Sequence, residues 1–466
     1  MDDVILVVGG GIAGLTAAWL LRRKYRSANV TLVERAVHLG GLLATYDYGR
    51  FGQFDCGMHW ITETGVKDID DFYLSLLPER DWAVLEGSRR DLSGLFYCGR
   101  LQENTQFPDL RGFKQEQYLA FLGDFFANLN QSKIAREDSL LSHARARFGR
   151  LIADTIIDPI ATKVHGIGSD LLDPMARYLP LLDRVVLFDE QAFLDLMESS
   201  ELRARLAFPE QRRLPLAYSS GRRSYYPRRY GMGQVIESIA AQLRESGVEL
   251  LTNAQVRGVE TKGSRIHRVE IKRGMGERRV FEPIQRLVWT ADAFPLAELL
   301  GLPPTQRKAP NRRTVIVSML LSAPPRMGDL YCFFCADPDF STYRVTNFTA
   351  FCPEAPRADC HPICVELLVK SADERDQQEH AKQAAREILA FGLIRSPDEV
   401  IFARAELLGS GFPNMARESI RSIETIRDAI DGSMVDNLTR AGILAKKDQF
   451  FQHDVLTDLY MKIDGL

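Results

Sequence analysis

The chain has 466 residues, of which 45% are hydrophobic and 26% charged, so it is long enough for two domains and too evenly mixed for a disordered or fibrous protein. Its 59 Lys and Arg against 62 Asp and Glu give a formal net charge of -3, which excludes nucleic acid as the expected partner because no overall basic field is available. The seven cysteines are an odd number, which suits reduced thiols in a cytoplasm better than a secreted disulfide framework.

The first stretch without charge, Val4 to Leu21, is long enough to cross a bilayer. Four glycines interrupt it, however, and it follows Asp2 and Asp3 with no basic region or cleavage site. We therefore expect neither a transmembrane segment nor a signal peptide. The expected location of the protein is the cytoplasm.

A glycine-rich turn lies inside this stretch. Val4 to Val8 predicts a strand and Ile12 to Arg23 a helix, with Gly9, Gly11 and Gly14 between them in the order GxGxxG. The first glycine permits a tight turn, the second lets backbone N–H groups approach a pyrophosphate, and the third lets helix and strand pack closely. The helix amino terminus then faces the phosphates.

An acidic residue follows at the spacing that this turn requires. A second predicted strand, Val30 to Val33, ends at Glu34, which stands 20 residues after Gly14. In such folds a carboxylate at this position binds a ribose hydroxyl pair and excludes a 2′-phosphate. Strand, glycines, helix, second strand and acid together predict a dinucleotide-binding site.

The residues after Glu34 resemble a family of flavoproteins. Gly40-Gly41-Leu42-Leu43 and Phe54-Asp55-Cys56-Gly57-Met58-His59 resemble the superfamily of amine oxidases, protoporphyrinogen oxidases and UDP-galactopyranose mutases. The resemblance implies FAD rather than NAD as the cofactor. The FAD-binding residues that it implies are Gly9, Gly11, Ile12, Ala13, Gly14, Glu34, Arg35, Gly40, Gly41, Leu42, Gly57, Met58, His59, Val256, Gly442, Asp454 and Val455.

Later elements alternate between helical and extended patterns. Helical patterns cover Tyr118 to Asn128, Leu140 to Ile157, Glu190 to Arg205 and Gln234 to Glu245. Predicted strands cover Glu249 to Thr252, Gln255 to Glu260, Arg286 to Ala291, Thr314 to Leu321, Tyr331 to Cys335, Tyr343 to Phe351 and Ile363 to Val369.

These elements predict an α/β fold, in which a Rossmann-like FAD-binding domain is interleaved with an α+β substrate domain. We expect the FAD-binding domain to comprise 1–95, 216–300 and 405–466. The substrate domain would comprise 96–215 and 301–404, as a helical insertion and an antiparallel sheet.

Several segments favour the mutases within this superfamily. Lys163-Val164-His165-Gly166 is similar to a mutase helix, with His165 in place of the aromatic residue of the mutases. Asp183-Arg184-Val185 is similar to the mutase segment that follows this helix. Tyr343-Arg344-Val345-Thr346 resembles the mutase strand whose arginine meets the substrate diphosphate. The resemblance implies catalytic roles for His59, beside the flavin, and for Arg344 and Arg184. Arginine suits a diphosphate because its planar fork pairs bidentately and stays charged.

Two functions follow from the resemblance. The first is isomerisation of a nucleotide sugar, an anionic small molecule, through an adduct at N5 of reduced flavin, with NAD(P)H as a candidate reductant. The alternative is an FAD-dependent oxidoreductase, similar to the amine or protoporphyrinogen oxidases, in which the flavin accepts hydride from an organic substrate.

A metal site is not expected. Cys332 and Cys335 have the spacing of a metal or redox pair, but they lie in a predicted strand, where residues three apart point to opposite faces. Cys352, Cys360 and Cys364 have no recognised zinc arrangement.

Overall fold

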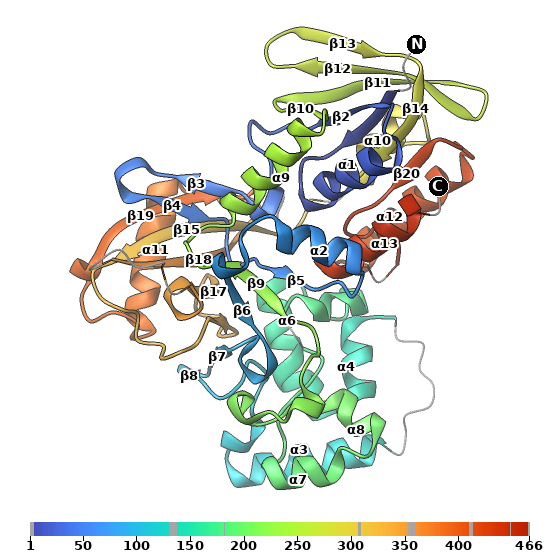
Figure 1. Ribbon diagram of the computed structural model, residues 1–466. Helices are drawn as coiled ribbons and strands as arrows, with labels where there is room; N and C mark the ends of the chain where they lie inside the picture. Colours follow the sequence, from blue (N-terminus) through green and yellow to red (C-terminus); the bar gives the residue numbers. More distant parts are fainter. Residues whose placement is uncertain are drawn as a thin grey trace. The chain divides into compact units, whose positions relative to one another are not determined.

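The computed structural model describes residues 4–129, 138–180, 182–305, 309–352, 354, 360–409, 413–447 and 449–464 (Figure 1). The chain forms two compact units, each made of separated segments. The first comprises 1–84, 224–307 and 421–466, and the second comprises 85–223 and 308–420. The predicted α/β fold with a Rossmann-like sheet is therefore confirmed.

The first unit is built on a parallel sheet of five strands. Its strands are β1 (Val4–Val8), β2 (Asn29–Val33), β10 (Glu249–Leu251), β14 (Ile284–Trp289) and β20 (Leu438–Arg440). The spatial order is β10-β2-β1-β14-β20, so β1 lies between two partners and is buried from Ile5 to Val8. Both neighbours run parallel to it, which explains its continuous apolar sequence.

Smaller elements complete this unit. Its other strands are β3 (Thr45–Asp47), β4 (Gln53–Asp55), β5 (Ile61–Thr62), β9 (Ser224–Pro227), β11 (Ala254–Lys262), β12 (Arg265–Arg273) and β13 (Glu277–Phe281), with β6 (Trp82–Leu85) at the junction with the second unit. Its helices are α1 (Ile12–Lys24), α2 (Lys67–Ser75), α9 (Gly233–Glu245), α10 (Ala293–Leu299) and α13 (Gln452–Asp464), and α12 (Arg417–Gly432) crosses the junction. The antiparallel β11-β12-β13 sheet shares a hydrophobic core with β1, β14 and α10.

The second unit is built on a mixed sheet of seven strands. Its strands are β7 (Ser93–Tyr97), β8 (Arg100–Gln102), β15 (Arg312–Leu321), β16 (Cys332–Cys335), β17 (Thr342–Asn347), β18 (His361–Lys370) and β19 (Val400–Leu407). They lie in the order β19-β15-β18-β17-β16-β7-β8. All the pairings are antiparallel except β16 with β7, which is parallel.

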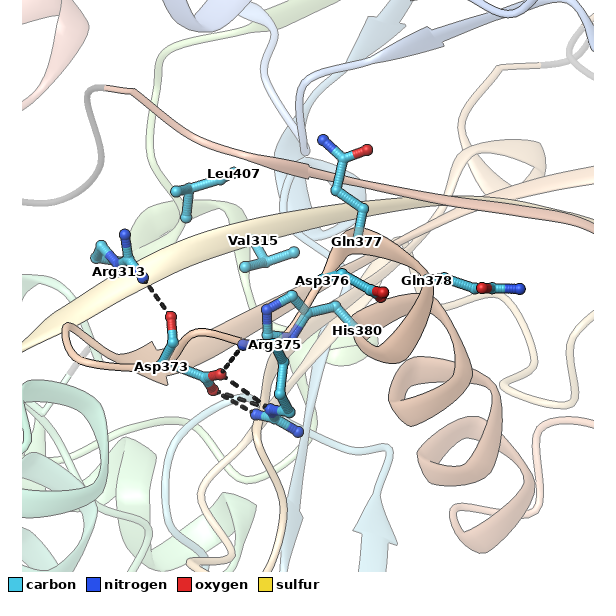
Figure 2. Close-up of a pocket in the computed structure, with 9 residues that line it drawn as sticks. All are labelled: Arg313, Val315, Asp373, Arg375, Asp376, Gln377, Gln378, His380 and Leu407. Carbon is cyan, nitrogen blue, oxygen red and sulfur yellow. Dashed lines mark hydrogen bonds and ion pairs between the residues drawn. The ribbon is translucent and has the colours of Figure 1, made fainter.

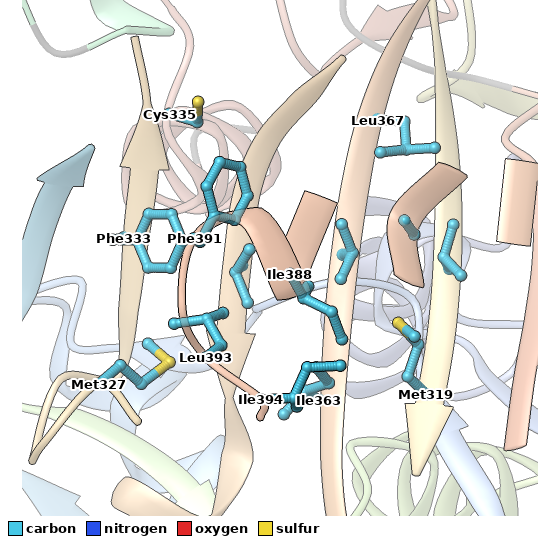
Figure 3. Packing of buried hydrophobic residues seen from close by; sticks show 14 of the residues in the cluster. Met319, Met327, Phe333, Cys335, Ile363, Leu367, Ile388, Phe391, Leu393 and Ile394 are labelled. Atoms are coloured by element: carbon cyan, nitrogen blue, oxygen red, sulfur yellow. The ribbon is translucent and has the colours of Figure 1, made fainter. Parts of the chain in front are cut away.

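One face of this sheet packs on α11 (Gln377–Ala390). Phe333, Val345 and Val365, on adjacent strands, belong to one hydrophobic cluster with Ile388 and Phe391. Figure 3 shows Phe333, Ile388 and Phe391 in this cluster. On each of these strands, the residues next to Phe333, Val345 or Val365 point to the opposite face of the sheet, because side chains alternate along a strand. The sheet therefore has one apolar face and one face that is free to carry polar side chains.

A helical segment precedes β15 in the second unit. Its helices are α3 (Gln115–Leu129), α4 (Leu140–Phe148), α5 (Arg150–Ile152), α6 (Asp158–His165), α7 (Glu190–Leu196) and α8 (Ser200–Arg205). Lys163 connects α6 to the sheet, because its buried Nζ donates to the carbonyls of Cys335 and Thr342 at 2.5 and 2.8 Å. Burial lowers the pKa of Lys163, which is held by neutral acceptors.

The helix predicted over residues 140–157 is interrupted. Gly149 has φ +89°, and Leu151 N donates to the carboxylate of Asp124 at 2.7 Å. A Cβ at Gly149 would lie 2.3 Å from the same carboxylate, so a tertiary contact from α3 ends one helix and caps the next. None of the described helices is long and apolar enough to cross a membrane.

Candidate functional site: a glycine-lined dinucleotide cradle

The glycine turn brings the start of α1 against the end of β1. A Cβ at Gly14 would lie 1.8 Å from the carbonyl oxygen of Gly9, so this position excludes every larger residue. Gly9 has φ +109°, which only glycine adopts without strain. A Cβ at Gly11, in contrast, would meet nothing within 4 Å, so the backbone there borders open space. These three environments fit the separate tasks that the motif predicts.

Glu34 is held beside this turn by backbone amides. Its two carboxylate oxygens accept from Gly10 N at 2.5 Å and from Ala36 N at 2.7 Å. Because a carboxylate has about four acceptor positions, it retains capacity for a pair of hydroxyl donors. The side chain is half-buried at the end of β2, the position at which the motif predicts ribose binding.

The second glycine pair is joined to the first. Gly40 N donates to Gly10 O at 2.8 Å, and Gly40 forms a bridge with Gly11. Gly40 and Gly41 have φ +106° and +58°. The two glycine turns, 29 residues apart in sequence, thus form one continuous backbone surface without side chains.

Thr290, which no sequence motif singles out, brings the carboxyl-terminal segment to this surface. Its N–H and Oγ1 both donate to Val8 O, at 2.9 Å each. A Cβ at Gly9 would lie 2.5 Å from Thr290 Oγ1, and one at Gly442 would lie 3.0 Å from Thr290 O. Gly442 therefore lies close to the first glycine turn, as its predicted role requires.

The remaining predicted cofactor residues occupy different surroundings. Val256 packs its side chain into the core below β11, and Val455 is buried in the first turn of α13 beside half-buried Asp454. Leu42 is exposed, whereas Ile12 and Met58 are half-buried. The cofactor roles of these residues stay predictions.

Asp55 fixes the loop that carries His59. Its carboxylate accepts from Tyr226 Oη at 2.6 Å, Thr45 Oγ1 at 2.8 Å and Met232 N at 2.9 Å. Its carbonyl accepts from Gly57 N at 2.9 Å, and the loop turns at Gly57 with φ +81°. Burial raises the pKa of Asp55 to about 6, although these hydrogen bonds oppose the shift. The half-buried His59 follows this anchored turn.

Arg344, in the second unit, forms an ion pair that the sequence did not reveal. Its Nε and Nη2 both lie 2.6 Å from Oε1 of Glu366, which is directly opposite on β18. The two side chains are 14% and 3% exposed. Burial alone would lower the pKa of Arg344, but the carboxylate more than offsets this effect and the pKa is raised. The charge of Arg344 is thus balanced within the protein.

Small polar side chains continue along the same face of the sheet. Neighbouring strands place them in the row Ser93, Cys332, Thr346, Cys364 and Ser318. All five are buried, and burial raises the pKa of Cys332 to about 11, which keeps that thiol protonated. Cys335 lies on the apolar face instead, so the structure confirms that the two cysteines of the pair point apart.

Arg184 has a different environment from Arg344. It is exposed, in a segment where Val185 N donates to Arg205 O at 3.1 Å. Arg184 and Arg344 belong to the second unit, and His59 belongs to the first. Their catalytic roles stay predictions.

Asp55→Asn should change the pH dependence of stability. Because the pKa of Asp55 is about 6 in the folded protein and near 3.8 otherwise, its ionisation opposes folding. The wild type should lose up to about 3 kcal/mol of unfolding free energy, relative to the Asn variant, as pH rises from about 3 to about 7. Urea denaturation of both proteins across this range measures the difference. Parallel pH profiles would contradict the assignment.

Glu366→Gln should destabilise the second unit. The change leaves the guanidinium of Arg344 buried without its carboxylate, which typically costs about 3–5 kcal/mol. Glu406→Gln is the matched control, since Glu406 pairs with Arg404 on the same sheet but with side chains 23% and 54% exposed, and it should cost less than about 1 kcal/mol. Equal losses of unfolding free energy in the two variants would disprove the special role of the buried pair.

Parts of this sequence are similar to known proteins. A model of the NAD(P)-binding Rossmann-like domain matches residues 7–75. The chain is 22% identical over 284 residues to the coproporphyrinogen III oxidase of Staphylococcus aureus; the match covers 56% of each, so the chain spans about half the length of this curated relative.

Solved structures match over the whole chain. Reduced UDP-galactopyranose mutase superposes with a TM-score of 0.74 at 15% identity, covering 100% of this chain and 93% of the mutase. A candidate protoporphyrinogen oxidase from Exiguobacterium gives 0.69 at 16% identity, with 100% and 98% coverage. Putrescine oxidase bound to putrescine gives 0.59 at 15% identity, with 100% and 98% coverage. This chain therefore has the fold of these structures, with a Rossmann-like domain of the kind that binds dinucleotides.

Proposed function

We propose that the chain is an FAD-dependent enzyme that acts on a small molecule. The observation that carries the proposal is the joined pair of glycine turns, with Glu34 beside them at the ends of β1 and β2. A dinucleotide needs a surface of exposed N–H groups for its pyrophosphate and a carboxylate for its ribose. The open space at Gly11 and the spare acceptor capacity of Glu34 fit both needs.

The residues of the first unit would hold FAD in defined ways. Gly11, Ile12 and Ala13, at the amino terminus of α1, would donate to the pyrophosphate, where the helix dipole favours negative charge. The Gly40–Gly41 turn would allow close approach of the cofactor, and the loop that Asp55 anchors would present Gly57, Met58 and His59 to it. Bound FAD supplies either a nucleophilic N5, when reduced, or an acceptor for hydride, when oxidised.

As the specific reaction we favour isomerisation of a nucleotide sugar, with NAD(P)H as the candidate reductant. Arg344, on a strand of the polar sheet face, would bind the diphosphate, with Arg184 as a second contact. The role of His59 would be to position the substrate. The fold similarity to UDP-galactopyranose mutase over the whole chain supports this choice, since it includes the unit that carries Arg344.

The Arg344–Glu366 pair also favours a second candidate, an oxidoreductase that takes hydride from an organic substrate. Because Glu366 balances Arg344 at 2.6 Å, an incoming diphosphate would have to compete with a buried carboxylate. A neutral substrate would leave the pair intact and could use the row of small polar side chains on the same sheet face. The curated relative from Staphylococcus aureus is named as an oxidase, which agrees with this candidate.

Glu34→Ala should release the cofactor. A hydrogen bond to a charged group contributes about 1.5–3 kcal/mol, so FAD affinity should fall about tenfold to a hundredfold. Flavin absorbance per mole of purified protein, followed by titration of the apoprotein with FAD, measures the loss. Glu260→Ala, which removes an exposed carboxylate paired with Arg268, is the control. Wild-type protein that neither carries nor binds FAD would overturn the cofactor proposal.

An anaerobic assay separates the two reactions. The reduced holoenzyme is mixed with a panel of nucleotide sugars while the flavin spectrum is recorded, and the products are separated by chromatography. We expect ring isomers to accumulate over many turnovers with the flavin still reduced. If no isomer forms, oxidised enzyme is tested with amines and porphyrinogens, where bleaching of the flavin would establish the oxidoreductase.

The role of Arg344 is tested within the same assay. Arg344→Ala should retain FAD but weaken nucleotide-sugar binding by a few kcal/mol. Since this change leaves Glu366 buried without a partner, the double variant Arg344→Ala/Glu366→Gln separates loss of the arginine from the repulsion of the remaining carboxylate. Unchanged substrate affinity in both variants would remove Arg344 from the site.

A further inference from the structure

The strand that carries Arg344 contains a β-bulge. In the antiparallel pair of β17 and β18, Thr342 lies opposite Leu367 and Arg344 lies opposite Glu366, with a shift of register between the two pairs. Two steps along β17 therefore correspond to one step along β18, so β17 has one extra residue at this point. A bulge of this kind bends the strand and changes the direction in which the next side chain points.

The bulge puts Thr342 and Arg344 on opposite faces of the sheet. α11 covers one face, and its first turn lines a cavity there together with β15 and β19 (Figure 2). Leu367 belongs to the apolar cluster with Ile388 of α11 (Figure 3), so Thr342, opposite Leu367, lies on the covered face. Glu366 and Arg344 lie on the other face. Residues two apart in a regular strand share one face, so this separation requires the extra residue.

A buried carboxylate of α11 holds the residues before the bulge. Glu387 is 3% exposed, and its carboxylate accepts from Ser341 N at 2.9 Å and from Thr342 N and Oγ1 at 2.8 and 2.5 Å. Gln383 Nε2 is a fourth donor, at 2.6 Å. These donors occupy the four acceptor positions that a carboxylate offers. Glu387 thus binds the backbone at the point where β17 begins.

Two further buried side chains hold the same stretch. Lys163, on α6, is 7% exposed and donates from Nζ to the carbonyls of Thr342 and Cys335 at 2.8 and 2.5 Å. Tyr343 Oη donates to Leu179 O at 2.5 Å. The two residues that precede Arg344 are therefore bound from three parts of the second unit that are distant in sequence.

We propose that Glu387 and Lys163 are positioning residues for Arg344. By binding Thr342 from α11 and α6, they keep the bulge in place and thereby hold the guanidinium on the face where it pairs with Glu366. Without the extra residue, a one-residue slip would turn Arg344 toward the apolar cluster, where a charge without a partner is strongly disfavoured. The inference rests on the proposed function in one respect, that Arg344 contacts the substrate.

The test measures the coupling between Arg344 and Glu366, which requires neither flavin nor substrate. The coupling is obtained from the unfolding free energies of Arg344→Ala, Glu366→Gln and the double variant. In the Glu387→Leu background the coupling should be lost, because the two side chains no longer lie opposite each other. Glu379→Leu is the matched control, since Glu379 is exposed on the same helix, and it should leave the coupling unchanged.

Substitutions at Thr342 distinguish positioning from a general loss of stability. Thr342→Val removes the hydroxyl donor to Glu387 and should weaken the coupling, as should Lys163→Met, whereas Thr342→Ser keeps the donor and should restore the coupling. A merely structural role would lower the stability of each background without changing the coupling. Coupling at the wild-type level in Glu387→Leu would overturn the proposal. The same result in Thr342→Val would overturn it even if Glu387→Leu does not fold.

The substrate assay separates this inference from the proposed function. If Arg344 binds the nucleotide sugar, Glu387→Leu should lower nucleotide-sugar affinity at least about tenfold, like Arg344→Ala, with unchanged FAD content. If the coupling is lost but the affinity is unchanged, Arg344 is removed from the substrate site, while its positioning by Glu387 is supported.

Discussion

The close approach of Gly14 to the carbonyl of Gly9 determines the geometry of the whole cradle, which is the backbone surface formed by the glycine turns at 9–11 and 40–41. At this point α1 approaches β1 so closely that even a methyl group would overlap the backbone. The approach aims the amino terminus of α1 along the edge of the sheet, beside the end of β2 where Glu34 stands. Gly40 can then donate to Gly10. Each later part of the cradle therefore depends on one position that has no side chain.

Electrostatics distinguish the two units. In the first, the polar groups of the cradle are backbone N–H groups and a half-buried carboxylate that keeps acceptor capacity. In the second, Arg344 and Glu366 are paired with each other, and their side chains are only 14% and 3% exposed. An anionic ligand that reaches Arg344 must either displace Glu366 or bind to a guanidinium whose charge Glu366 already balances. Under the proposed function, Glu366 decides whether an anionic or a neutral substrate can bind beside Arg344.

What the sequence could predict follows from how local each signal is. The strand, glycine turn, helix and Glu34 lie within about 35 residues and have a fixed spacing, so their arrangement could be read directly. The opposite faces of Cys332 and Cys335 followed from strand alternation alone. In both cases the relevant geometry is contained in a few neighbouring residues.

The missed features depend on contacts between distant segments. Glu366 meets Arg344 only because β17 and β18 pair in one register, and Tyr226 reaches Asp55 across 171 residues. Thr290 connects β1 to Gly442, which is 152 positions further along the chain. The break at Gly149 likewise requires Asp124 of another helix. The spacing of apolar residues indicates which side chains are buried, but it does not identify their partners. Such pairs are therefore found only in the tertiary structure.

The order of the parallel sheet has a consequence for synthesis of the protein. The central strand β1 is made first, yet one of its two neighbours, β14, begins at Ile284, and the edge strand β20 begins at Leu438. Pairing between such distant segments closes long loops and is slow. While the chain leaves the ribosome, β1 and β2 have α1 to pack against but no further strand of this sheet to pair with until β10 and β14 are made. Gly442 therefore joins the glycine-lined surface only after the segments of the second unit have been translated.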